Sequence, residues 1–153
     1  NQPIPLTSQQ AIETFVAQGK PLILLHAAVW YNWNDWPKYN LAYVGGGSKS
    51  HETFQEFKNI VINTSNPITK GVSESFIFKD ELYRAEPDQA GLGINVLVVG
   101  LSLETGKVYP VVYTVNHNVS RIVGITLGHD ENSHLNTDYR KLLTNSVNWA
   151  LNL

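Results

Sequence analysis

Three short apolar runs in this chain each lead directly into ionisable side chains. Residues 22–25 are followed by His26, residues 76–78 by Asp80 and Glu81, and residues 122–127 by His129. Runs of this length and apolarity are typical of buried strands. Because ligands of open α/β sheets bind at the carboxyl ends of the strands, the pattern predicts one shared polar site at a rim of the sheet.

Two longer segments have the spacing of amphipathic helices, and one pair of segments reads as a hairpin. Residues 7–18 and 137–151 repeat apolar side chains at helical intervals, and Thr7 is placed to cap the first helix. Residues 95–103 and 108–115 are β-like runs around a short turn. A chain of 153 residues has the size of one domain. We therefore expect a single α/β domain, with an open, mainly parallel sheet flanked by helices and an antiparallel hairpin extension.

The absence of cysteine removes several kinds of chemistry. There is no disulfide framework, no thiolate nucleophile and no cysteine-based zinc site. The net charge is -2 without a Lys/Arg cluster, so we expect no nucleic-acid partner, and no apolar run approaches the ~18 residues of a membrane span. Gly91-x-Gly93 precedes a strand instead of following one, so we expect no nucleotide cofactor. The many Asn, Trp and Tyr residues favour an exported (periplasmic or extracellular) protein over a cytoplasmic one.

A series of short motifs runs along nearly the whole chain. In order they read PLILLHAAVW, YVGGGSKSH, NPITKG, KDELYR, YPVVYT and RIVGITLGH, followed by a closing helix that ends in NWAL. With this order and spacing the chain resembles the ThuA-like (trehalose utilisation) family. The resemblance implies a flavodoxin-like fold related to class I glutamine amidotransferases. It also implies a role in sugar metabolism, including that of oxidised (keto) sugars.

The recurrent polar positions of that family include every strand-end residue named above. They are His26, Trp30, His51, Asp80, Glu81, Tyr83, Arg121 and His129. The chain departs from the family at Asn66, where a histidine is common, and at Tyr113, where a tryptophan is common. Family members also carry further βα units ahead of the region that starts here. The resemblance therefore implies that residues 1–153 are the C-terminal two-thirds of a ThuA-like domain, whose N-terminal units are absent or form a separate chain.

Histidine and glutamate at strand ends can do chemistry in two ways. The first is a divalent metal site formed by His26, His51, Glu81 and His129, with zinc as the expected ion. A bound water would then supply the nucleophile, because neither Cys nor Ser stands at the turn after residue 25. The second is a metal-free pocket in which His26, Glu81 and His129 act as catalytic acid and base. Purely structural hydrogen bonding of these side chains at the strand ends is a third interpretation.

Other side chains are candidates for binding a substrate. Asp80 and Glu81 point to opposite sides of an extended chain, so we place Glu81 in the pocket and give Asp80 a supporting role. Trp30 follows the first histidine by one helical turn and is the candidate for stacking on a sugar ring, whereas some aromatic residues that follow it are expected to be core. Tyr83 and Arg121 complete the substrate-binding set, Tyr83 through a hydrogen bond to a substrate oxygen.

These observations favour a sugar-active enzyme. We expect a hydrolase or isomerase that acts on a (keto-)sugar or glycoside through the His/Glu pocket, with or without the metal. The alternative is a non-catalytic carbohydrate-binding or interaction module. The expected partners are a small-molecule sugar and either the N-terminal segment of the domain or a second copy of the chain.

Overall fold

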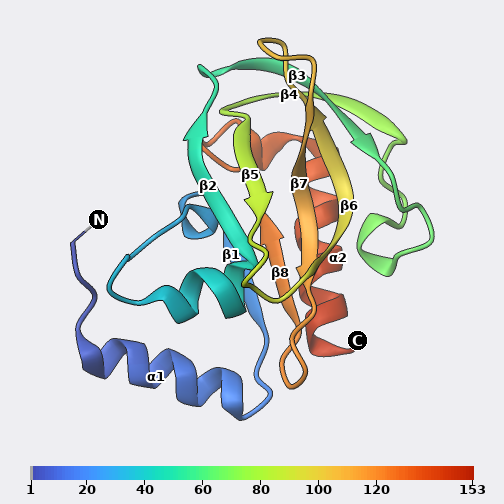
Figure 1. The fold of residues 1–153 in the computed structure, drawn as a ribbon. Helices are drawn as coiled ribbons and strands as arrows, with labels where there is room; N and C mark the ends of the chain where they lie inside the picture. Colours follow the sequence, from blue (N-terminus) through green and yellow to red (C-terminus); the bar gives the residue numbers. More distant parts are fainter. Residues whose placement is uncertain (1) are drawn as a thin grey trace.

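The computed structural model describes residues 2–153 as a mixed α/β fold (Figure 1). Its helices and strands are α1 (Leu6–Ala17), β1 (Leu22–Leu25), β2 (Gly46–His51), β3 (Gln55–Val61), β4 (Ser75–Asp80), β5 (Tyr83–Pro87), β6 (Ile94–Leu101), β7 (Val108–Val115), β8 (Ile122–Ile125) and α2 (Thr137–Leu151). Short 3₁₀ turns cover His26–Val29, Pro67–Thr69 and Ser133–Leu135, and a π-helical turn covers Tyr39–Val44. Between residues 2 and 153, neither α-helix has the length and hydropathy to cross a bilayer.

Six of the strands form one sheet in the order β1-β8-β7-β6-β3-β4. Only β1 and β8 pair in parallel, whereas β7–β8, β6–β7, β3–β6 and β3–β4 are antiparallel. The expectation of a mainly parallel, flavodoxin-like sheet is therefore wrong, although the predicted hairpin of β6 and β7 is confirmed. A parallel neighbour needs a long crossover connection, and within the described residues most adjacent strands are joined by turns and loops that favour antiparallel pairing.

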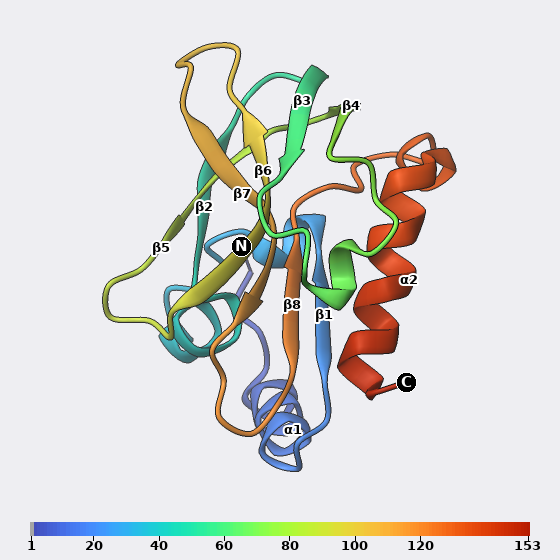
Figure 2. The same cartoon turned by 90° about the vertical axis from the view of Figure 1, so that its right-hand side faces the viewer.

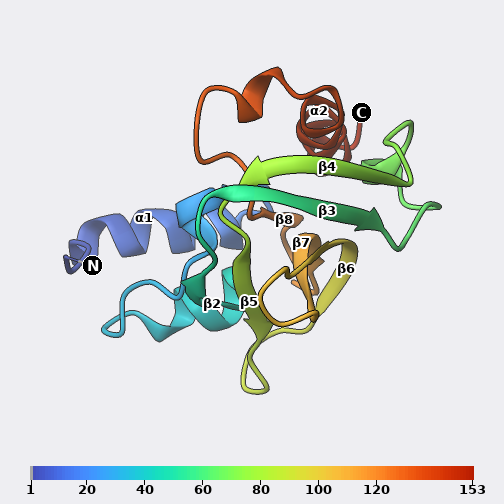
Figure 3. The same ribbon diagram turned by 90° about the horizontal axis from the view of Figure 1, so that it is seen from above.

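The sheet is covered by different material on its two faces (Figures 2 and 3). Helix α2 lies along one face, where Tyr139 and Leu142 pack against Leu97, Val123 and other strand residues. On the opposite face lie α1, the aromatic segment after β1, and a separate two-stranded ribbon formed by β2 and β5. Two apolar cores therefore sandwich the sheet, and the loops after β1, β4 and β8 meet at the rim between them.

The ends of the two helices are fixed in different ways. Asn136 caps α2, and its side-chain oxygen accepts hydrogen bonds from the backbone N–H groups of Asp138 and Tyr139. The predicted cap of α1 by Thr7 is wrong, because that helix begins at Leu6 after Pro5 and has no side-chain cap. Proline before the first turn needs no such cap for its own nitrogen, since it has no N–H to satisfy.

Candidate functional site

The backbone at His26 forms a sharp turn between β1 and the following 3₁₀ turn. His26 has φ 44°, a left-handed conformation that is unusual for a residue with a side chain. The turn resembles the strained strand-to-helix elbow that presents a nucleophile in α/β-hydrolases, but here it presents an imidazole. The ring is fixed by a hydrogen bond of 2.8 Å between its Nδ1 and the backbone carbonyl of Thr126 on the neighbouring chain segment. The positive φ of His26 and its hydrogen bond to Thr126 together direct Nε2 out of the sheet.

The side chain of Asp80 connects the loops after β4 and β8. It is fully buried, and its Oδ2 accepts hydrogen bonds from the N–H groups of Gly128 (2.7 Å) and His129 (3.3 Å). Its Oδ1 accepts the N–H of Glu81 at 2.7 Å. The Asp80 carboxylate therefore accepts hydrogen bonds from the backbone of the loops that carry Glu81 and His129, which is the supporting position expected for Asp80.

Glu81, His26 and His129 form a compact triangle above this support. His26 Nε2 lies 3.3 Å from His129 Nδ1, and Glu81 Oε2 lies 3.3 Å from His129 Nδ1 and 3.8 Å from His26 Nε2. The three atoms come from loops that follow β1, β4 and β8, so the strand-end pattern does bring them to one rim. The side chain of Glu81 is about one-fifth exposed, whereas that of His129 is more open, which gives the triangle one side facing solvent.

The hydrogen-bond partners fix which nitrogen of His26 is available. A carbonyl oxygen can only accept, so Nδ1 carries the proton that it donates to Thr126, and in the neutral ring Nε2 has the lone pair. Tyr83 Oη lies 3.0 Å from Nε2 and can donate to it. Burial, and then the charges of Glu81 and Asp80, raise the pKa of Tyr83 to about 12, so its hydroxyl stays protonated at neutral pH.

His51 lies beside the triangle and not within it. Its Nδ1 is 2.8 Å from the backbone carbonyl of Glu52 and 3.7 Å from Glu81 Oε1, the carboxylate oxygen that faces away from the two other histidines. The donor position of Nδ1 is therefore engaged, and the approach of His51 to Glu81 is an ion-pair distance without a hydrogen bond. Asp80 also lies close enough to His26 and His129 to be considered as a ligand, but the backbone N–H groups already occupy its oxygens.

An aromatic cavity adjoins the triangle on the side of Tyr83. It has a volume of about 490 Å³ and is lined by Ala27, Ala28, Trp30, Asn32, Trp33, Tyr39 and Tyr83. The Trp30 ring stands edge-on to the rings of His51 and Tyr83, at 5.7 and 5.2 Å between centroids. Trp36, Tyr39 and Tyr43 are buried, as expected for part of this stretch, whereas Trp30 and Trp33 remain half-exposed. An aromatic wall with an open side therefore faces the imidazole cluster.

Arg121 lies at the other end of β8, away from the triangle. It precedes β8, whereas His129 follows it, and its guanidinium donates to the carbonyl of Trp149 and stacks over that indole ring. The structure therefore does not bring Arg121 together with the other residues of the predicted substrate site. A residue that opens a strand is separated by the length of that strand from one that closes it, and sequence proximity to an apolar run does not distinguish the two ends.

Two side chains contribute to the site without having been selected from the sequence. The Phe54 ring lies 5.1 Å from that of His129 and walls its outer side, and Trp33, which has φ 42°, lines the aromatic cavity. The signal for Trp33 was present in the crowded aromatic stretch, where only Trp30 was chosen. Phe54 had no signal, because it stands in a polar loop whose fold places it against a distant residue.

The fold and its rim define a mixed α/β protein with a His/Glu cluster at the strand ends. The model of the ThuA family, described as trehalose utilisation, matches residues 1–150, and the chain therefore belongs to that family. No curated protein matches the chain.

Solved structures agree on the fold. The chain is 22% identical to a ThuA-like protein from Bacteroides uniformis and 22% identical to one from Parabacteroides merdae, each with a TM-score of 0.81. The matches cover 97% and 98% of this chain but only 65% and 67% of those chains, so the chain spans about two thirds of their length. A cytoplasmic protein from Salmonella typhimurium is 10% identical, with a TM-score of 0.65, and is matched over 97% of this chain and 62% of its own.

Proposed function

We propose that this protein is a sugar-active enzyme, a hydrolase or isomerase of a (keto-)sugar or glycoside, that holds a divalent metal ion on His26, Glu81 and His129. The proposal joins the membership in the trehalose utilisation family to the geometry of the triangle. The single observation that carries it is the spacing of three ligand atoms at 3.3, 3.3 and 3.8 Å.

This spacing suits zinc. With metal–nitrogen and metal–oxygen bonds of about 2.0–2.1 Å, the ligand atoms of a tetrahedral site lie roughly 3.3–3.4 Å apart. The protein edges of the triangle are close to that value before any adjustment. Because Nδ1 of His26 donates to Thr126, Nε2, the nitrogen beside His129 and Glu81, has the lone pair that a metal ion would use. Two imidazoles and one carboxylate also form the donor set of catalytic zinc sites, in which a fourth position stays open.

The surrounding residues have separate roles in this proposal. Asp80 fixes the loops that carry Glu81 and His129, and His51 faces the second oxygen of Glu81. A bound divalent ion would supply an activated water for hydrolysis or would polarise a sugar ketone for isomerisation. Tyr83, held protonated by burial, can turn its O–H from His26 to a sugar oxygen. Trp30 provides the stacking surface at the cavity wall.

Metal analysis and histidine variants test the proposal. Protein stripped of metal and titrated with Zn²⁺ by calorimetry is expected to bind one ion, and His26→Ala or His129→Ala should weaken that binding by at least about 100-fold. His134→Ala is the matched control, because this exposed histidine contacts Tyr139 and not the triangle. Activity on a panel of keto-sugars and disaccharides is then compared in the same proteins. Absence of Zn²⁺ binding, together with unchanged activity in both triangle variants, would overturn the proposal.

The aromatic cavity supports a second candidate, a carbohydrate-binding module without catalysis. Trp30 and Trp33, which line the cavity, are partly exposed, and this role needs no metal. Saccharide binding that is lost in Trp30→Ala and retained in His26→Ala would favour this candidate over the enzyme. Loss of turnover in His26→Ala with retained binding would favour the enzyme.

A further inference from the structure

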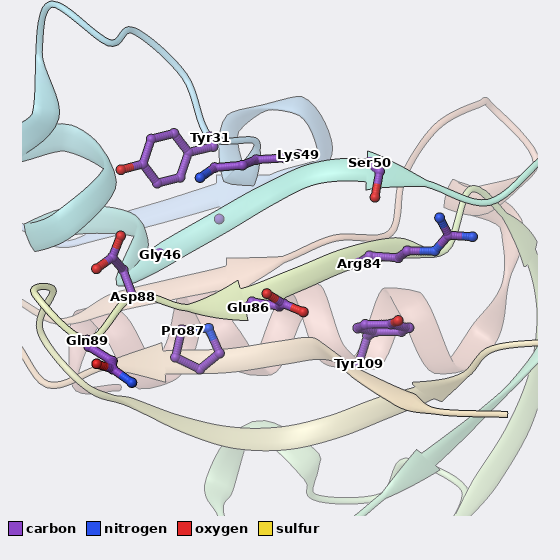
Figure 4. A pocket seen from close by; sticks show the side chains of 11 residues that line it. Tyr31, Gly46, Lys49, Ser50, Arg84, Glu86, Pro87, Asp88, Gln89 and Tyr109 are labelled. Atoms are coloured by element: carbon purple, nitrogen blue, oxygen red, sulfur yellow. The ribbon is translucent and has the colours of Figure 1, made fainter. Parts of the chain in front are cut away.

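A polar groove lies along the β2–β5 ribbon (Figure 4). Its volume is about 470 Å³, within the range of ligand pockets, which is about 300–1,000 Å³. The residues that form its two long walls are Tyr31, Lys49 and Ser50 on the β2 side and Arg84, Glu86 and Asp88 on the β5 side. Tyr109 of β7 closes one end.

The alternation of the ribbon separates the groove from the proposed active site. Gly47 pairs with Glu86 and Ser48 pairs with Ala85, so neighbouring residues of each strand point to opposite faces. Ser48, Tyr83 and Ala85 are buried on the face toward the core, where Tyr83 reaches His26. Lys49, Arg84 and Glu86 consequently stand on the other face and line the groove. The two cavities therefore share β5 but not their lining side chains.

The floor of the groove is bare backbone. Gly46 and Gly47 have φ 142° and 135°, a region that L side chains rarely adopt, and a Cβ on Gly46 would meet the carbonyl of Glu86 at 2.2 Å. This glycine run is the start of β2, where close approach of the two strands excludes side chains. Glycine here leaves a trough bounded by polar side chains.

Some polar side chains of the groove have no hydrogen-bond partner among the described residues. Within residues 2–153, no hydrogen bond or ion pair engages the carboxylate of Glu86 or the amide of Gln89. Among the described residues, the ammonium of Lys49 has one charged or polar interaction, with the ring of Tyr31 at 4.2 Å from its centroid. Donors and acceptors that converge without partners can exchange their water for the hydroxyl groups of a ligand.

The charges in the groove select against an anion. Lys49 and Arg84 are balanced by Glu86 and Asp88, and the guanidinium of Arg84 is already paired with Glu104 and lies 3.9 Å from the buried carboxylate of Glu52. A phosphate group would therefore gain little and would face two carboxylates. The polar lining equally disfavours a lipid or another apolar molecule.

We infer that this groove is a second binding site, distinct from the proposed active site, for an uncharged polyhydroxylated ligand of mono- or disaccharide size. Hydroxyl groups both donate and accept, which matches the mixture of carboxylate, amide, ammonium and phenol around the trough. The site makes no use of the triangle and does not require its chemistry. Strand β5 carries both Glu86, which lines the groove, and Tyr83, which contacts His26. A ligand in the groove would therefore contact the same strand that reaches His26.

Two-dimensional amide NMR with α,α-trehalose as the probe tests the inference. Saturable shifts are expected for residues 46–50, 84–86, 88 and 89, and Glu86→Ala should weaken binding by about tenfold, the effect of one lost hydrogen bond to a charged group. Glu74→Ala, the same change at an exposed carboxylate of the loop before β4, is the matched control and should leave binding unchanged. The same spectra report whether each variant is folded.

Two further arms separate this site from the proposed function and from an anion site. His129→Ala should abolish metal binding and leave the groove shifts in place, so failure of one proposal does not imply failure of the other. Trehalose 6-phosphate should bind no more tightly than trehalose. The inference is overturned by the absence of saturable shifts on the two strands, by equal affinity of the Glu86 and Glu74 variants, or by preferential binding of the phosphorylated sugar.

Discussion

The two ends of the β1–β8 pair are built from the same parallel strands and serve opposite purposes. At the amino end, polar side chains form hydrogen bonds with backbone carbonyls: Ser120 donates to the carbonyl of Lys20 at 2.6 Å, and Arg121 donates to that of Trp149. At the carboxyl end, His26 and Gly128 have positive φ values of 44° and 121°, which is strained for His26 but accessible to glycine, and imidazole and carboxylate groups face one another.

The difference teaches that residue type does not identify a site. Both ends carry charged and polar side chains, but only the carboxyl end brings two imidazoles and a carboxylate within 3.8 Å of one another. At the amino end each polar group completes a structural hydrogen bond and has little left for a ligand. At the carboxyl end one buried carboxylate, that of Asp80, accepts the backbone hydrogen bonds, and the side chains of Glu81, His26 and His129 contact one another.

Removal of the buried carboxylate should break the carboxyl end most severely. Asp80→Ala leaves the N–H groups of Glu81, Gly128 and His129 without their acceptor, and we expect a loss of about 3 kcal/mol in the free energy of unfolding. Urea denaturation measures this loss. Asp35→Ala, at an exposed position, is the control and should cost less than about 0.5 kcal/mol. Equal midpoints for the two variants would show that Asp80 does not support the rim.

A methyl group at Gly128 should be the next most damaging change. The φ of 121° disfavours alanine, and the added Cβ would lie 2.8 Å from the hydroxyl of Tyr139, so we expect a loss of about 2–3 kcal/mol. Gly71→Ala is a matched control, because Gly71 also has positive φ (72°) but has open space around its Cβ position. That control should lose only about 1 kcal/mol. Similar losses in thermal unfolding would mean that contact with Tyr139 is unimportant.

Tyr83→Phe should sharpen the comparison through pH. Burial raises the pKa of Tyr83 to about 12, above the value of about 10 in an unfolded chain. The contribution of the protonated Tyr83 to the free energy of unfolding is therefore complete below pH 10 and is lost as the pH rises toward 12. Wild-type stability should fall over this window, and the variant should fall less steeply. At neutral pH the lost hydrogen bond to His26 should cost about 1 kcal/mol. Parallel urea midpoints from pH 9 to pH 11.5 would contradict this assignment.

Arg121→Ala should have the smallest effect. The side chain is exposed to solvent on one side and contributes one hydrogen bond and one cation–π contact, both to Trp149, so we expect a loss of about 0.5–1 kcal/mol. Zn²⁺ titration and saccharide NMR should match those of the wild-type protein. A large loss of either binding would return Arg121 to the functional site.

Much of the fold could be predicted from local pattern. The hairpin of β6 and β7, the strand before His26 and the helix Thr137–Leu151 all follow from apolar periodicity and turn residues, which act over a few neighbours. The direction of the sheet could not be predicted in this way, because periodicity does not specify the partner of a strand. The β2–β5 ribbon was missed for the same reason, since a glycine-rich run becomes a strand only when β5 lies beside it.

The candidate site divides along the same line. Strand-end position selected His26, Asp80, Glu81 and His129 from the sequence, because apolar runs reveal where buried strands stop. The sequence could not separate Arg121 from them, and it could not show that His51 engages a carbonyl with its Nδ1. Each of those distinctions depends on a contact between segments far apart in the chain.

By itself, the sequence determined which chemistry is possible: imidazoles, carboxylates and aromatic rings with no thiol, placed where buried runs end. The tertiary structure alone decided which of these groups share a rim, which nitrogen of His26 keeps its lone pair, and which polar residues are already satisfied. The physical reason is that composition and periodicity are local properties of the chain. Proximity and hydrogen-bond saturation arise only when distant strands pair.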